Sequence, residues 1–191
     1  LVQLERSGWV TRDEGRLDDS VDLCSPRTRS VIYDRIEPPR RSELHLAVAE
    51  SYVRVYRRRR HVAPLIALHR LRGGRPAQAL PMLIDGAWEA WDEGNERRAR
   101  TLFNQACEAR DQAESELDTD ERPRLLARLY RLEGELAAAR EEWEAARAAY
   151  QQALTAAALA DDHQGHVAAL VGLGSCLERA GDLDEALARL E

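Results

Sequence analysis

The sequence predicts an all-α protein built as a stack of helical hairpins, and three observations support this fold class. Ala and Leu occur 30 and 26 times among the 191 residues, and both residues favour helices. Through most of the chain, apolar residues recur at three- and four-residue spacing, which is the period of an amphipathic helix. Short breaks rich in Gly, Asn and Asp separate these segments, and such short connections make neighbouring helices antiparallel.

The first 37 residues differ from the rest of the chain, and we treat 1–37 as a separate region. A short helix is expected to end before Gly8, because glycine commonly follows the last turn of a helix. Strands are predicted at residues 9–11 and 21–24, where β-favouring residues flank a polar turn. Ser25 and Pro26 then provide the cap and first residue of a helix that reaches Ile36. This order resembles the end of a winged-helix domain, with the strands as a short β-wing.

Pro38 and Pro39 are expected to break the chain before the helical array begins. Residues 38–79 are interpreted as a linking helical hairpin, and residues 80–191 as a repeat region. Helices are predicted near residues 40–58, 61–72, 76–93, 96–113, 122–139, 142–160, 163–180 and 183–191.

The segments 80–113, 127–160 and 167–191 share a register of small and large residues. Small residues such as Ala87 and Gly134 occupy position 8, and aromatic residues such as Tyr150 occupy position 24. This register resembles the tetratricopeptide repeat, whose period is about 34 residues. The resemblance implies a right-handed α-solenoid, in which small residues let the helices cross closely and large ones fill the gaps. The third repeat is truncated, and a generic Ala/Leu helical bundle is the alternative.

Composition and motifs argue against several other classes of protein. The chain carries 34 acidic and 28 basic residues, for a net charge of −6, and contains no apolar run of the roughly 20 residues that a membrane-spanning helix needs. No signal peptide, nucleotide-binding loop, zinc-protease motif or hydrolase nucleophile motif occurs in it. Three cysteines fit reduced thiols better than a disulfide framework. We therefore expect a cytoplasmic, non-catalytic fragment of a longer protein that needs no cofactor and no metal.

A wider resemblance covers residues 1–110. A two-strand wing is followed by the segments Val31-Ile32-Tyr33-Asp34, Glu43-Leu44-His45 and Ile66-Ala67-Leu68-His69. Together they resemble the junction between winged helix and repeats in bacterial STAND-type ATPase regulators, which are often fused to Ser/Thr protein kinases, nucleotide cyclases or transcription-activator domains. The resemblance implies a sensor region in which binding of a protein or peptide changes how the array restrains an ATPase core, which is a two-state switch. A free-standing scaffold for complex assembly is the alternative.

In repeats of this type, defined positions of each first helix line the concave groove. Here those positions predict a partner-binding groove made by the residues Ile84, Trp88, Trp91, Arg128, Arg131, Glu135, Val171 and Ser175. Two indoles beside a pair of arginines suit an amphipathic or acidic peptide. The alternative is that Trp88 and Trp91 pack against the hairpin at 40–72.

The remaining candidate residues have simpler interpretations. The run Arg57–Arg60 suggests a nucleic-acid-binding regulator that also uses the winged helix, but a charged surface facing acidic residues is favoured. His163 and His166 have metal-ligand spacing, yet they lie beside Asp161 and Asp162 at a helix start, where acidic caps are common. His45, His69 and the three cysteines are interpreted as packing residues.

Overall fold

The computed structural model describes residues 7, 10–12, 21–23, 25–56, 62–113 and 115–180. The chain divides into two compact units, Leu1–Leu44 and His45–Glu191. The predicted first helix before Gly8, the run Arg57–Arg60, Cys24 and the predicted helix 183–191 lie outside the described residues.

The first unit contains a short β-hairpin and a helix. Strands β1 (Val10–Arg12) and β2 (Val21–Leu23) pair antiparallel, with Val10 opposite Leu23. They lie within one residue of the predicted strands. Helix α2 (Pro26–Arg35) begins as predicted, because the Ser25 side chain accepts a hydrogen bond from the Thr28 backbone N–H and Pro26 occupies the first turn.

Helix α3 (Pro38–Val55) corrects one prediction. Pro38 and Pro39 do not break the chain before the helix; they are its first two residues. A proline is tolerated there because the first backbone N–H groups of a helix have no partner within the helix. Helix α3 also ends at Val55 rather than at residue 58.

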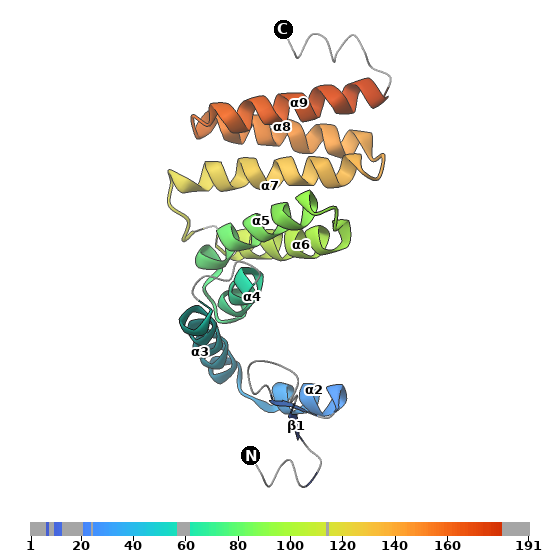
Figure 1. Ribbon diagram of the computed structural model, residues 1–191. Coiled ribbons are helices and arrows are strands. Elements are labelled where there is room, and N and C mark those ends of the chain that lie inside the picture. The colour runs from blue at the N-terminus through green and yellow to red at the C-terminus, as the bar shows by residue number, and fades with distance from the viewer. Residues whose placement is uncertain are drawn as a thin grey trace. The chain divides into compact units, whose positions relative to one another are not determined.

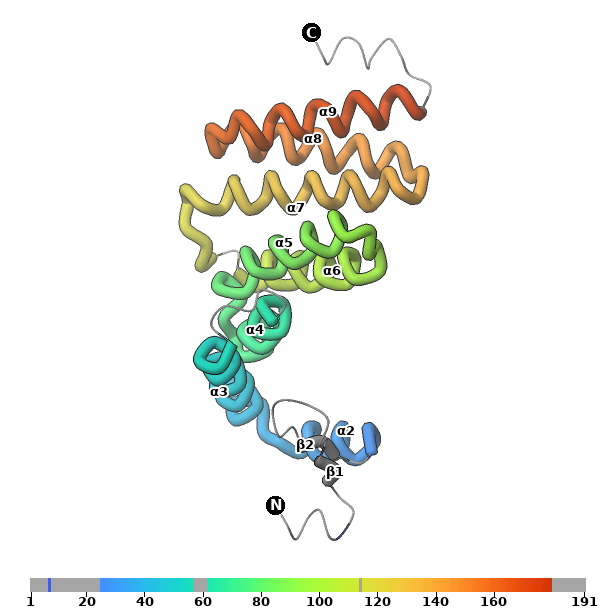
Figure 2. Tube along the Cα trace, viewed as in Figure 1, coloured from blue at the N-terminus to red at the C-terminus, as the bar shows by residue number. Residues whose placement is uncertain are grey.

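The second unit continues with a stack of helices whose bounds agree with the predicted ones to within two residues. They are α4 (Ala63–Arg72), α5 (Pro76–Asp92), α6 (Glu96–Gln112), α7 (Glu121–Ala138), α8 (Trp143–Leu159) and α9 (His163–Ala180). Helices adjacent in sequence pack as hairpins, and α7 also contacts α5, α6 and α9 (Figure 1). The tube in Figure 2 shows α7, α8 and α9 running side by side. This arrangement is a tetratricopeptide-like helical stack.

The breaks between these helices follow from local backbone chemistry. Gly74 and Gly94 adopt positive φ angles of 72° and 73° directly after α4 and α5, a conformation that glycine adopts without steric cost. At the start of α6, the Asn95 side chain accepts a hydrogen bond from the Arg98 backbone N–H at 3.1 Å. Asp162 caps α9 in the same way through the Gly165 N–H at 2.9 Å, as the sequence predicted.

The core runs along the stack in two main clusters. One joins α4, α5, α6 and α7 through residues such as Leu80, Leu83 and Leu132. The other joins α7, α8 and α9 around Tyr150, which is 2 % exposed. Within the described part of the chain, no helix is long and apolar enough to cross a membrane.

Candidate protein-interaction groove

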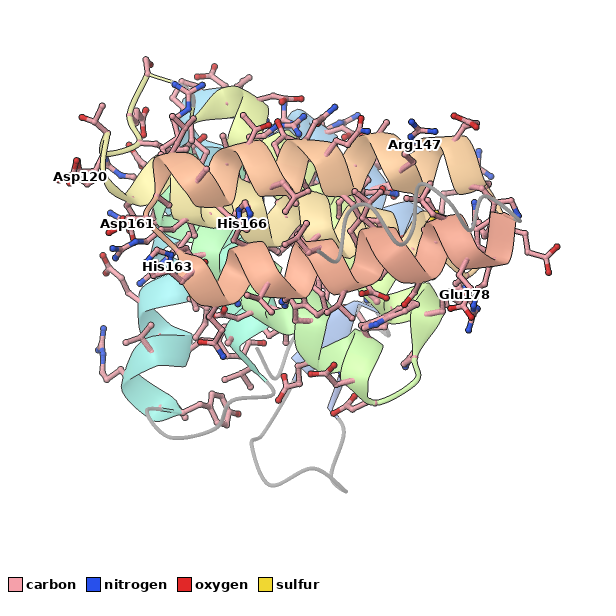
Figure 3. The ribbon with its side chains drawn as sticks, turned by 90° about the horizontal axis from the view of Figure 1, so that it is seen from above. Asp120, Arg147, Asp161, His163, His166 and Glu178 are labelled. Carbon is pink, nitrogen blue, oxygen red and sulfur yellow. The ribbon has the colours of Figure 1, made fainter. Side chains whose placement is uncertain are left out.

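The predicted groove residues lie on α5, α7 and α9, the first helices of the three predicted repeats. Asp120 lies one residue before α7 and Asp161 two residues before α9, and both lie at the same end of the stack in Figure 3, with Glu178 at the other end. Helices α7 and α9 therefore run in the same direction. Their equivalent positions repeat along one side of the array, as the repeat register requires.

Trp88 joins α5 to α7. Its indole N–H donates a hydrogen bond to the backbone carbonyl of Arg128 at 3.2 Å. The guanidinium of Arg131 lies over the Trp88 ring, with its central carbon 4.2 Å from the ring centre. At this distance the cation is attracted to the negative face of the ring. Trp88 is half-buried, so its ring both packs against the core and borders the surface.

The other two apolar groove candidates on α5 differ in burial. Ile84 is 0 % exposed and belongs to the core shared by α4, α5, α6 and α7. Because no partner can reach a fully buried side chain, we remove Ile84 from the groove. Trp91 is half-buried and packs against the same core, as Trp88 does.

The arginines of α7 are already engaged within the chain. Arg128 forms an ion pair with Asp85 of α5 at 2.6 Å. Exposed pairs of this kind contribute only about 0–1 kcal/mol to stability, but this one ties the Arg128 guanidinium to a carboxylate of α5. Arg131 is held over Trp88, and its Nε atom is buried. Neither guanidinium projects freely from this face.

Glu135, Val171 and Ser175 extend the predicted face along α7 and α9. Glu135 is half-buried, and its carboxylate lies close enough to Tyr150 to affect the pKa of the phenol. Burial, together with this carboxylate, raises the pKa of Tyr150 well above its usual value. Val171 is 55 % exposed and Ser175 is also exposed. Val171 and Ser175 are therefore accessible to a partner, whereas the Glu135 carboxylate already interacts with Tyr150.

An open groove of about 770 Å³ lies where α4, α5 and α7 meet, and it includes residues that were not predicted. Its apolar lining comes from Ala63, Pro64, Met82, Gly86 and Trp88. Its charged lining comes from Asp85, Glu89, Asp92, Glu93 and Arg128. The sequence already contained the pattern for this acidic wall. Residues 89, 92 and 93 follow residue 85 by four, seven and eight positions, which places all four along one side of the helix.

The candidate metal site at the start of α9 does not bring enough ligand side chains together. His163 and His166 lie at the start of α9, close to Asp161 (Figure 3). His163 Nε2 is 3.8 Å from an Asp161 oxygen, with both side chains more than nine-tenths exposed. Among the residues that the structure describes, no group of three or more His, Cys, Asp or Glu side chains is placed to hold a metal ion.

Two cysteines are described, and both are shielded from solvent to some degree. Burial raises the pKa of the Cys107 thiol to about 11. Cys176 is 2 % exposed, and its thiol donates a hydrogen bond to the Trp143 carbonyl at 3.5 Å. Because the thiolate is the reactive form, these environments favour the predicted packing role over nucleophilic chemistry.

Comparison with known proteins supports the repeat assignment for the C-terminal third of the chain. Residues 125–191 match the family model of the tetratricopeptide repeat. The matched region includes the α7–α8 hairpin and α9. No curated protein and no solved structure matches the chain.

Proposed function

We propose that this chain is a non-catalytic protein-interaction module that binds a protein or peptide partner along the face formed by α5, α7 and α9. The observation that carries the proposal is the tetratricopeptide-like stack with an open groove at its α5–α7 boundary. Tetratricopeptide repeats generally mediate protein–protein interaction, and grooves between helices are common binding sites.

We further infer that the module is the sensor region of a larger bacterial signal-transduction ATPase. The support is the resemblance of residues 1–110 to the junction between winged helix and repeats, together with the antiparallel strand pair and capped helix α2. In this proposal, the first unit is the end of a winged-helix domain. Partner binding to the repeats then biases a two-state equilibrium of the ATPase core, which requires different affinities for the two states.

Site-specific photo-crosslinking in the intact protein tests the binding face. A photoreactive amino acid at Val171 or Ser175 reports the proposed face, and one at Ala148 of α8 is a matched control on another exposed surface. We expect a common partner to crosslink from Val171 and Ser175 and not from Ala148. Equal crosslinking from all three positions would contradict the proposed face.

The signalling role needs a separate measurement. In the full-length protein, Val171→Glu and Ser175→Arg should change the rate of nucleotide hydrolysis in the presence of the crosslinked partner, while Ala148→Glu leaves it unchanged. A partner that binds at this face without any change in hydrolysis would instead indicate a scaffold for complex assembly.

A further inference from the structure

We propose that the groove between α4, α5 and α7 recognises a basic peptide segment, in which Arg or Lys residues flank an apolar side chain. The inference rests on the proposed function, because it names the partner chemistry of the same face. It differs from the sequence-based expectation of an acidic or amphipathic peptide, and the difference comes from where the charged side chains lie.

The groove has an apolar base that suits one buried side chain. Met82 and Trp88 of α5 line it together with Pro64 at the start of α4. Gly86 keeps α4 and α5 close, because a Cβ at that position would lie 2.9 Å from Cγ of Pro64. Aromatic and aliphatic side chains in such a pocket are typical anchors of peptide interfaces.

The wall around this base is strongly acidic. Four carboxylates line the groove and a single guanidinium, that of Arg128, opposes them. Asp85 is paired with Arg128 at 2.6 Å, and Glu93 lies 3.4 Å from Arg98. Glu89 and Asp92 form no ion pair with any residue that the structure describes. Two carboxylates are therefore available to a partner.

Their placement matches two cationic groups on one segment. Glu89 and Asp92 are three residues apart on α5, so they lie on the same side of the helix, about 5–6 Å apart at Cβ. Arg131 is not among the residues that line the groove, and its guanidinium is held against the Trp88 ring. A carboxylate-rich peptide would be repelled from this wall, whereas guanidinium or ammonium groups would be attracted.

Fluorescence anisotropy with three labelled synthetic peptides tests the proposal on the complete chain. One peptide carries four Arg around a central Leu, the second replaces Arg with Glu, and the third replaces Leu with Ser. We expect the first to bind, the second not to bind, and the third to bind at least about threefold more weakly, since the apolar anchor is lost.

A pair of charge-matched double variants locates the site. Glu89→Gln with Asp92→Asn should weaken binding of the Arg/Leu peptide by roughly fivefold or more, because two ion pairs with the peptide are lost. Glu108→Gln with Glu116→Gln removes the same charge from other exposed positions and should have little effect. Equal weakening by the two double variants would overturn the proposal, because binding would then follow net charge alone.

The Trp88 indole N–H provides an independent readout by NMR. Its resonance should shift on titration with the Arg/Leu peptide, whereas that of Trp143, which packs in the α7–α8–α9 core, should not. If the acidic peptide binds as well as the basic one, the basic-partner proposal fails, while crosslinking from Val171 and Ser175 still decides the proposed function separately.

Discussion

The two boundaries between successive hairpins are built differently. At the α7–α9 boundary, the Tyr150 ring lies between Gly134 and Gly172: a Cβ at either position would lie within 2.8 Å of the ring carbon Cζ. At the α5–α7 boundary, Phe103 occupies the position equivalent to Tyr150, and Ala87 and Leu132 occupy those of the two glycines. Tyr150 is 2 % exposed, whereas Phe103 is half-buried.

This difference indicates how a repeat array forms a binding surface. Where glycines admit an aromatic ring between helices, the ring is buried and the boundary is filled. Where larger side chains occupy the same positions, the boundary is instead spanned by Trp88, through its contacts with Arg128 and Arg131. The open groove lies beside this second kind of boundary.

The largest expected effect is the loss of the Tyr150 ring. Tyr150→Ala should lower the free energy of unfolding by about 3–5 kcal/mol, because a large buried aromatic side chain leaves a cavity. Phe103→Ala should cost less, since part of that ring already contacts solvent. Urea denaturation of both variants measures the difference, and a larger loss for Phe103→Ala would contradict the comparison.

Overpacking at a helix crossing should have the next largest effect. Ala146, in the repeat position expected to be small, is 0 % exposed, so Ala146→Leu should cost about 1–3 kcal/mol. Ala148 lies two residues further on α8 and is exposed, and Ala148→Leu should change stability by less than about 0.5 kcal/mol. Thermal melts that rank these variants in the opposite order would show that the repeat register is wrong.

Gly134→Ala should have a smaller net effect, because two terms oppose each other. The added methyl would lie 2.7 Å from Cε1 of Tyr150, and Gly172 confines the ring from the other side. Such overpacking lowers the free energy of unfolding by about 1–3 kcal/mol. Replacing Gly by Ala within a helix raises it by about 1 kcal/mol.

A double-mutant cycle isolates the contact of Gly134 with the ring. With Tyr150→Ala in place, the ring is absent, and Gly134→Ala should become neutral or stabilising. If Gly134→Ala remains equally destabilising in that background, the ring is not what requires glycine at this position.

The joint between α3 and α4 extends the comparison to polar packing. His45 Nδ1 and His69 Nδ1 are 2.9 Å apart, and Tyr52 stacks on His69. This hydrogen bond needs one unprotonated Nδ1, so the joint does not tolerate two imidazolium rings. Burial lowers the pKa of both histidines below 6.5, and for each of them the positive charge of Arg72 contributes in the same direction.

Stability should therefore fall as the pH is lowered through 6.5, because the unfolded state then binds more protons than the folded state. Above pH 6.5 the stabilising contribution of the histidine pair is fully present. Urea denaturation between about pH 7.5 and about pH 5 measures how steeply the free energy of unfolding changes with pH. His69→Phe should reduce this slope, whereas His163→Gln, at an exposed site, should not. Comparison with the unmodified chain cancels the contribution of Glu133, whose pKa is raised by burial. An unchanged slope in His69→Phe would contradict the role of the pair.

The helix positions, the breaks and most caps could be predicted from the sequence, because these depend on local properties. Only a few neighbouring residues are needed to recognise the apolar spacing of a helix and the breaks or caps at Gly74, Gly94, Asn95 and Asp162. The repeat register likewise identified Ala146 and Tyr150 as packing positions. The two prolines at the start of α3 were misassigned, because proline is compatible with both a break and a first helical turn.

Which side chains of the predicted groove remain accessible could not be predicted from the sequence, because it depends on packing between helices. Helical periodicity placed Ile84, Trp88 and Arg131 near one face, but burial and pairing depend on the neighbouring helix. Ile84 is enclosed by the core, Arg131 covers Trp88, and Arg128 is paired with Asp85 across the α5–α7 boundary. The open groove is lined by four carboxylates and one guanidinium, and contacts between residues about 40 positions apart in the chain engage the two arginines.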